Sequence, residues 1–158
     1  MPHHLAQMNI AQMSGKPSEP AMAGLVSRIE EMNALAESSP GFVWRLRGAQ
    51  VGLEDLKVFE GYFNPFEPEV IFYNMSVWES VEHLRHYVFK SAHAQMLRAK
   101  EQWMARFDKP QLVLWWIAMG EKPSIAESAR RLRLLEENGP CPEAFNFRQL
   151  YPAPLDSA

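Results

Sequence analysis

The stretch QLVLWWIAM at residues 111–119 constrains the fold most strongly, because it is apolar at nearly every position. A strand of this kind is buried on both of its faces. The chain must therefore build a sheet that is covered on both sides. Its length of 158 residues suits one domain that can bury such a sheet.

Strand-like and helix-like patterns alternate along the chain in a defined order. The patterns predict strands over 4–13, 42–47, 69–78 and 111–119 and helices over 20–38, 79–107 and 124–138. The second helix has an alternative break near Ser91, and residues 48–68 form an irregular connection with a short extended piece at 56–59. The order β-α-β-β-α-β is the ferredoxin-like one, in which helices lie on one face of a four-stranded antiparallel sheet. We therefore expect one α+β domain over 1–158, with a core over 4–120 and a C-terminal helix and tail over 121–158.

The first strand predicts how the two faces of the sheet differ. Alternation places Leu5, Gln7, Asn9 and Ala11 on one face and Ala6, Met8 and Ile10 on the other. A single helical layer covers only one face, so the second apolar face needs another cover. The simplest cover is the same face of a second copy, which predicts a two-fold homodimer.

Composition excludes several classes of function. The net charge is −3 with basic and acidic residues interspersed, so we expect no nucleic-acid partner. A single cysteine, Cys141, excludes an internal disulfide and a cysteine-based zinc cluster. The N-terminus lacks the pattern of a secretory signal, and no apolar run is long enough to span a bilayer, so we expect a cytoplasmic protein without a membrane partner. The sequence contains no glycine-rich phosphate loop, nucleophile elbow or zinc-protease motif.

Three histidines fall in or near the second predicted helix. His83 and His86 lie opposite its apolar stripe, and no third ligand joins them, so we interpret both as solvated and expect no metal site. His93 joins an apolar face with Leu97, Met104 and Phe107 if the helix breaks near Ser91. A partly buried imidazole there could act as an acid or base near neutral pH. The alternative is a packed histidine that hydrogen-bonds to a backbone carbonyl.

Amides and aromatic residues suggest a pocket between sheet and helices. If the face that carries Gln7 and Asn9 meets the helices, their amides need hydrogen-bond partners or a polar cavity. The alternative is an edge strand with a solvent-facing polar row. Aromatic side chains are numerous enough for some to line an apolar ligand pocket. The candidates for substrate binding are Trp44, Tyr73, Trp78, Trp103 and Trp116.

Five strings in this sequence resemble a known family: LAQMNIAQ, NALAESSPGFVWRL, NMSVWES, LVLWW and ENGPCPEAFNF. Together they are similar to the bacterial DUF3291 family, whose activity is not assigned. The resemblance covers nearly the whole chain and implies a dimeric α+β barrel. Its superfamily also includes antibiotic biosynthesis monooxygenases and small haem-degrading monooxygenases.

The haem-degrading enzymes imply particular site residues. They carry an asparagine on the first strand, an aromatic residue after a VWxS-type string and a histidine further along that helix. The matching positions here are Asn9, Tyr87 and His93, which we take as the candidate catalytic residues. Two differences argue against haem: the aromatic residue is Tyr87 where those enzymes usually have tryptophan, and the spacing to His93 is shorter by about one helical turn. We therefore expect no cofactor, with haem as the alternative.

These observations favour an enzyme that acts on a small, largely apolar or aromatic molecule held between sheet and helices. In a cofactor-independent monooxygenase, His93 would deprotonate a phenol or enol, and Asn9 would hydrogen-bond to the developing oxyanion. Tyr87 and Trp78 would shape the pocket. One alternative is a cofactor-free lyase or cyclase with a histidine and tyrosine as acid–base pair. Another is a dimer that binds a small ligand without catalysis.

Overall fold

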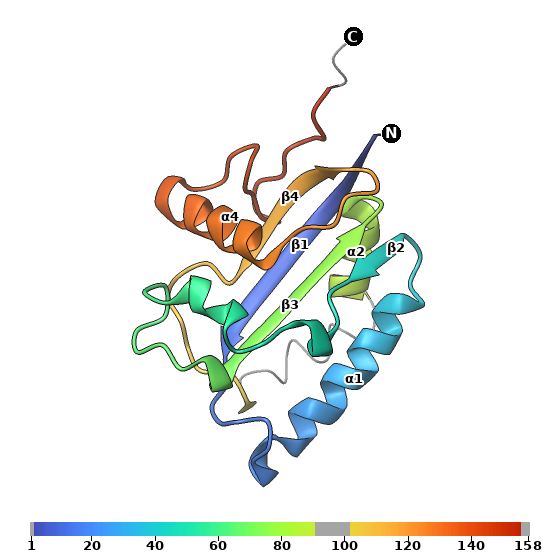
Figure 1. Ribbon diagram of the computed structural model, residues 1–158. Coiled ribbons are helices and arrows are strands. Elements are labelled where there is room, and N and C mark those ends of the chain that lie inside the picture. The colour runs from blue at the N-terminus through green and yellow to red at the C-terminus, as the bar shows by residue number, and fades with distance from the viewer. Residues whose placement is uncertain (1, 91–101, 156–158) are drawn as a thin grey trace.

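The computed structural model describes residues 2–90 and 102–155, and Figure 1 shows how they are arranged. Four strands form one antiparallel sheet in the order β2-β3-β1-β4, which is the ferredoxin-like order. This confirms the predicted fold class. The main elements are β1 (His3–Gln12), α1 (Ala23–Glu37), β2 (Phe42–Arg45), β3 (Ile71–Trp78), α2 (Val81–Lys90), β4 (Leu112–Ala118) and α4 (Ile125–Asn138).

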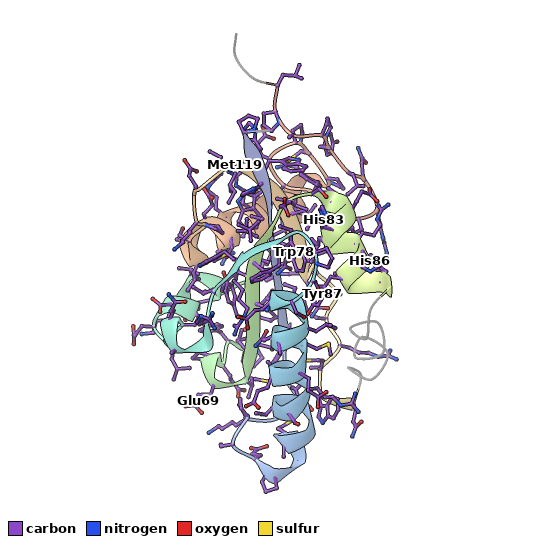
Figure 2. All side chains as sticks on the ribbon, turned by 90° about the vertical axis from the view of Figure 1, so that its right-hand side faces the viewer. Glu69, Trp78, His83, His86, Tyr87 and Met119 are labelled. Atoms are coloured by element: carbon purple, nitrogen blue, oxygen red, sulfur yellow. The ribbon has the colours of Figure 1, made fainter. Side chains whose placement is uncertain are left out.

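The two faces of the sheet have different covers. α1 and α2 pack on the face of Leu5, where Ala36, Leu84 and Tyr87 join it in one buried cluster. The opposite face of β1 packs against α4 and the connection between β2 and β3, and Figure 2 views the sheet between these two layers. The buried residues of this second layer are Leu56, Phe59, Tyr62, Phe63, Ala129, Leu132 and Leu135.

This second layer corrects the argument for a dimer. We expected a second copy to cover the face of Ala6, Met8 and Ile10, but these side chains are at most 1% exposed within one chain. The irregular connection over 48–68 folds over this apolar surface. Its piece over 55–59 is a 3-10 helix (Asp55–Phe59) and not the extended segment that we expected. The homodimer itself stays a prediction, without its original basis.

The second helix is shorter than predicted. α2 ends at Lys90 within the described part of the chain, and residues 102–107 are not α-helical. Met104 instead forms a bridge with Met13, and the Ser14 backbone N–H donates to the carbonyl of Trp103 at 2.7 Å. The predicted helix over 79–107 is therefore wrong at its C-terminal end. The predicted break at Ser91 lies outside the described residues.

Local sequence signals explain the ends of α4. The side chain of Ser124 accepts a hydrogen bond from the Glu127 backbone N–H at 3.1 Å, which satisfies a free donor of the first turn. Gly139 ends the helix at φ = 73°, a conformation that favours glycine. The tail that follows returns to the sheet, where Phe145 exchanges two backbone hydrogen bonds with Leu114 and covers the outer edge of β4.

β2 contains an irregularity that changes the direction of its side chains. The register between β2 and β3 shifts between Phe42 and Trp44. Phe42 consequently packs against Trp78 on the α1–α2 side of the sheet, while Trp44 packs on the α4 side. Strict alternation along this strand would place Phe42 and Trp44 on one face, and the bulge separates them because it inserts a residue into the alternation.

Candidate functional site

A cavity of about 1070 Å³ lies between the sheet and helices α1 and α2. Its floor is formed by β1 and β3, and residues 104–108 line one end. Apolar side chains provide much of the wall, including Met32 of α1, Val88 of α2 and Phe147 of the tail. A polar cavity was one of two alternatives for the polar face of the first strand, and the other, a solvent-facing row on an edge strand, is wrong because β1 lies between β3 and β4.

The floor carries four polar side chains that we call the polar row: Gln7, Asn9, Asn74 and Ser76. They lie together because β1 and β3 pair with Gln7 opposite Ser76 and Asn9 opposite Asn74. Directly opposite side chains on one face of an antiparallel pair are close neighbours. Polar residues alternate along both strands, and the pairing of β1 with β3 brings these residues together. This alternation along β3 is the sequence signal that could have added Asn74 and Ser76 to the candidate residues.

Part of the polar row is already hydrogen-bonded. The Gln7 side-chain Nε2 donates to Asn74 Oδ1 at 2.8 Å and to Ser76 Oγ at 2.8 Å. Trp78 Nε1 donates to the same Ser76 hydroxyl at 2.9 Å. These contacts hold the buried amide of Gln7 in place and satisfy its donors.

Asn9 differs from the rest of the row. Its side-chain amide lines the cavity and is half-buried. Among residues 2–90 and 102–155, the side chain of Asn9 has no hydrogen-bond partner, although Gln7 and Asn74 next to it do. A partly buried amide that faces a cavity in this way can donate to, or accept from, a bound molecule.

Tyr87 lies between the cavity and the core. Its ring stacks on Trp78 with ring centroids 5.1 Å apart, and its hydroxyl donates to the Met32 carbonyl at 2.9 Å. Burial raises the pKa of Tyr87 to about 12, while the positive charge of Arg45 acts in the opposite direction. Tyr87 is therefore protonated at neutral pH and suited to hydrogen bonding and packing, not to acting as a base. Figure 2 shows Trp78 and Tyr87 beside α2.

Arg45 is a wall residue that the sequence analysis did not select. Its side chain is only 13% exposed, and its Nε donates to Glu37 Oε1 at 3.3 Å. The bulge in β2 brings this residue to the cavity side, opposite Ser76 of β3. Simple alternation along β2 gave no sign of this position.

The predicted site residues lie in different parts of the structure. Asn9 and Tyr87 line the cavity together, and Trp78 lies behind Tyr87, while His93 lies outside the described residues. Trp44 and Tyr73 pack on the opposite face of the sheet, where the Tyr73 hydroxyl lies 2.7 Å from Ser128 Oγ. Their position argues against a role in binding a substrate in this cavity.

The two remaining tryptophans among the candidate substrate-binding residues, Trp103 and Trp116, also lie outside the cavity lining. Trp103 packs with Met22 and Leu25 in a separate cluster, and a Cβ atom added at Gly24 would lie 2.9 Å from its ring. Trp116 Nε1 donates to the Tyr151 carbonyl at 2.9 Å and so anchors the tail. Both positions argue against substrate binding by these residues.

The two histidines of α2, His83 and His86, are not among the residues that line the cavity. His83 is half-buried, and its Nδ1 lies 2.8 Å from Ser80 Oγ at the start of the helix. His86 is exposed. The side chains of 2–90 and 102–155 include no group of three or more histidine, cysteine, aspartate or glutamate residues that could hold a metal ion. In the same ranges, no helix is long and apolar enough to cross a membrane.

The fold and the cavity together define a ferredoxin-like α+β protein with a cavity between its sheet and the helices α1 and α2. Residues 4–158 match the model of the family described as domain of unknown function DUF3291, so the chain belongs to that family. No curated protein matches the sequence significantly.

Similar solved structures include three bacterial proteins, each with a TM-score of 0.45 and each covering 77% of this chain. NE2512 from Nitrosomonas europaea, a protein of unknown function, is 11% identical with 93% of its chain covered. PA3566 from Pseudomonas aeruginosa is also 11% identical, with 98% covered. SnoaB from Streptomyces nogalater, a cofactor-independent oxygenase, is 14% identical with 97% covered. These similarities are too weak to assign a function to this chain.

Proposed function

We propose that this protein binds a small, largely apolar or aromatic organic molecule in the cavity and oxidises it with dioxygen without a cofactor. The observation that carries the proposal is the side-chain amide of Asn9, which faces the cavity beside a hydrogen-bonded polar row. The cavity of about 1070 Å³ has the size of a small-molecule site. Its mixture of apolar walls and a few placed polar groups is also typical of such sites.

The polar row would orient one oxygen of the substrate. In this proposal, the Asn9 amide donates to a phenol or enol oxygen and stabilises the negative charge that develops there when the substrate loses a proton. The hydrogen bonds from Gln7 hold the neighbouring Asn74 and Ser76 in place. A preorganised donor of this kind does not have to reorient during the reaction.

The reaction needs no electrons beyond those of the substrate. Deprotonation gives an electron-rich carbanion, which transfers electrons to dioxygen and forms a carbon–oxygen bond. For a substrate with a reactive methylene group, one oxygen atom stays on the carbon as a carbonyl. The other leaves as water with the two hydrogens of the methylene. Apolar walls such as Met32 and Val88 would keep bulk water away from the reactive carbanion.

The cofactor-free lyase or cyclase remains a second candidate, and simple ligand binding a third. The lyase form requires a tyrosine as acid, but the Tyr87 hydroxyl already donates to the Met32 carbonyl. This contact favours the oxygenase over a lyase that uses Tyr87. Binding without catalysis requires only the cavity. A protein of this kind would bind the ligand but would not convert it, unlike the oxygenase and the lyase or cyclase.

Oxygen uptake with a panel of hydroxyanthrones and enols tests the proposal. We expect uptake by the wild-type protein and a loss of roughly 100-fold in Asn9→Ala, because one oxyanion donor is worth about that much in rate. Asn9→Asp should lose more, since its carboxylate repels the developing oxyanion. Asn138→Ala is the matched control, because Asn138 is an exposed asparagine at the end of α4 on the other side of the sheet.

The possible outcomes separate the three functions. Uptake that is the same in Asn9→Ala and Asn138→Ala would contradict the assigned role of Asn9. Conversion of a substrate without oxygen consumption would favour the lyase or cyclase. Binding of the panel compounds without any conversion would leave the ligand-binding protein. His93 lies outside the described residues, and its role as the base stays a prediction that His93→Ala tests in the same assay.

A further inference from the structure

The charged groups of the cavity are unevenly distributed. The described lining residues include three with charged side chains: Arg45, Arg106 and Asp108. Arg106 and Asp108 are exposed at the end of the cavity near the Met13–Met104 bridge, so water and salt screen their charges. Arg45 is at the other end, and its side chain is only 13% exposed. Its charge therefore acts on the cavity most strongly.

The charge of Arg45 is only partly balanced. Its partner Glu37 also pairs with Arg47, whose Nη2 lies 3.2 Å from the second carboxylate oxygen. Although desolvation would raise the pKa of the Glu37 carboxyl, the hydrogen bonds and charges of Arg45 and Arg47 hold it below its ordinary value. One carboxylate thus serves two guanidinium groups, which leaves a net positive charge at this end of the cavity.

Arg45 also has hydrogen-bonding capacity left over. Its Nε donates to Glu37, and its Nη1 has a long contact of 3.5 Å with the Leu46 carbonyl. Within the described part of the chain, its Nη2 has no hydrogen-bond partner. A guanidinium carries five N–H donors, so Arg45 retains donors for a ligand. Among the described lining residues, Ser76 lies opposite Arg45 on β3, and Tyr87 is near enough for the charge of Arg45 to lower its pKa; neither carries a negative charge at neutral pH.

We infer that the cavity selects organic anions, with the Arg45 guanidinium binding an anionic oxygen at one end of an apolar ligand body. The inference rests on the proposed function, because it names the ligand class of the same cavity. The anionic oxygen belongs to a carboxylate or to an ionised phenol or enol, both of which a guanidinium binds through charge-assisted hydrogen bonds. An uncharged ligand of the same shape would leave the buried charge of Arg45 partly unpaired and should bind more weakly.

Two fluorescent dyes with nearly the same apolar body test this inference. Anilinonaphthalenesulfonate is anionic, and N-phenylnaphthylamine is its neutral counterpart without the sulfonate. We expect the wild-type protein to bind the anionic dye more tightly, and Arg45→Gln to weaken that binding by about tenfold or more. Binding of the neutral dye should stay within about twofold. Arg45→Lys keeps the charge and should retain part of the preference.

Arg47→Gln is the matched control for charge. Arg47 pairs with the same Glu37, but its side chain is 62% exposed and it does not belong to the described lining of the cavity. Its loss leaves Glu37 to Arg45 alone, so binding of the anionic dye should weaken by less than in Arg45→Gln, and binding of the neutral dye should stay within about twofold of wild type. Equal losses of anion binding in Arg45→Gln and Arg47→Gln would overturn the inference, as would an equal loss of both dyes in Arg45→Gln. In the unchanged protein, added salt should weaken binding of the anionic dye and spare the neutral one.

A cavity-filling variant separates this inference from the proposed function. Ala11 faces the cavity from β1, so Ala11→Trp should block the binding of both dyes. If both dyes still bind Ala11→Trp, they bind elsewhere and the cavity itself is not a binding site. If Ala11→Trp blocks both dyes but Arg45→Gln leaves the anion preference intact, the cavity function stands and the anion inference fails. Displacement of the anionic dye by naphthoate or by ionised naphthol identifies which anionic oxygen the site prefers.

Discussion

At the residue scale, Tyr87 connects the two helices above the cavity. Its hydroxyl donates to the Met32 carbonyl of α1 at 2.9 Å, while its ring stacks on Trp78 of β3. Tyr87→Phe removes the hydroxyl and keeps the ring. We expect the free energy of unfolding to fall by about 1 kcal/mol, the usual net value of one hydrogen bond with allowance for the carbonyl left unpaired. Urea unfolding monitored by tryptophan fluorescence measures this, and no change would mean that water replaces the contact.

Three buried tyrosines predict a loss of stability at high pH. Burial raises the pKa of Tyr87 to about 12 and also raises the pKa values of Tyr62 and Tyr73 above the ordinary value of 10.0. Each group holds its proton more tightly in the folded state than in the unfolded state. Their contribution to stability is therefore fully present below pH 10 and is lost as the pH rises from 10 through the folded-state pKa values.

The measurement compares urea unfolding at neutral pH with unfolding above pH 10, together with phenolate absorbance. Phenolate formation by these tyrosines should accompany unfolding. In Tyr87→Phe the decrease of stability with pH should be shallower, because one of the three linked groups is gone. An equally steep decrease in the variant would assign the effect to the other groups.

The site residues show which contacts a sequence can predict. Alternation along β1 was enough to place Gln7 and Asn9 on one face, because a strand's side chains have a period of two, but it left open whether that face meets the helices. The same rule places Tyr73 and Trp78 on opposite faces of the sheet, because an odd number of positions separates them in one strand. Arg45 could not be found in this way, because the bulge in β2 breaks the alternation. Such irregularities depend on tertiary pairing and leave little trace in local composition.

At the element scale, α4 covers the second face of the sheet and depends on its N-cap. The Ser124 side chain accepts from the Glu127 backbone N–H, while the Glu127 carboxylate accepts from Trp115 Nε1 at 3.3 Å. We expect Ser124→Ala to lower the free energy of unfolding by about 1 kcal/mol. Ser124→Asp should preserve stability, because aspartate is an equally good N-cap. Thermal and urea unfolding of the two variants check this, and equal losses in both would contradict the capping role.

The same scale shows where helix prediction failed. α4 was predicted correctly over 124–138 because a capping serine and a terminal glycine mark its ends. The predicted helix over 79–107 contained neither glycine nor proline, so apart from the alternative break near Ser91 no local signal ended it before Pro110. In the structure, tertiary contacts determine the conformation of residues 103–104, because Trp103 and Met104 pair with the residues that follow β1. Long-range pairing of this kind overrides local helix preference.

At the scale of the whole molecule, one chain covers both faces of its sheet. Met8 is fully buried on the α4 side, in a cluster with residues of the 48–68 connection and α4. Asn9, the next residue, faces the cavity on the other side. If the α4 side were an interface between subunits, a charge there would produce folded monomers. If the chain covers it alone, a charge there must destabilise the fold itself.

We therefore expect Met8→Asp to abolish cooperative unfolding. A buried, unpaired carboxylate costs several kcal/mol, and the lost packing of a buried methionine adds about 2–5 kcal/mol, against a total stability of about 5–15 kcal/mol for a typical domain. Asn9→Asp is the adjacent control and should stay folded, because its carboxylate faces a polar cavity. Circular dichroism reports folding, and size-exclusion chromatography with light scattering reports mass. A folded Met8→Asp protein of half the wild-type mass would show that this face joins two subunits, and that α4 gives way to a second copy.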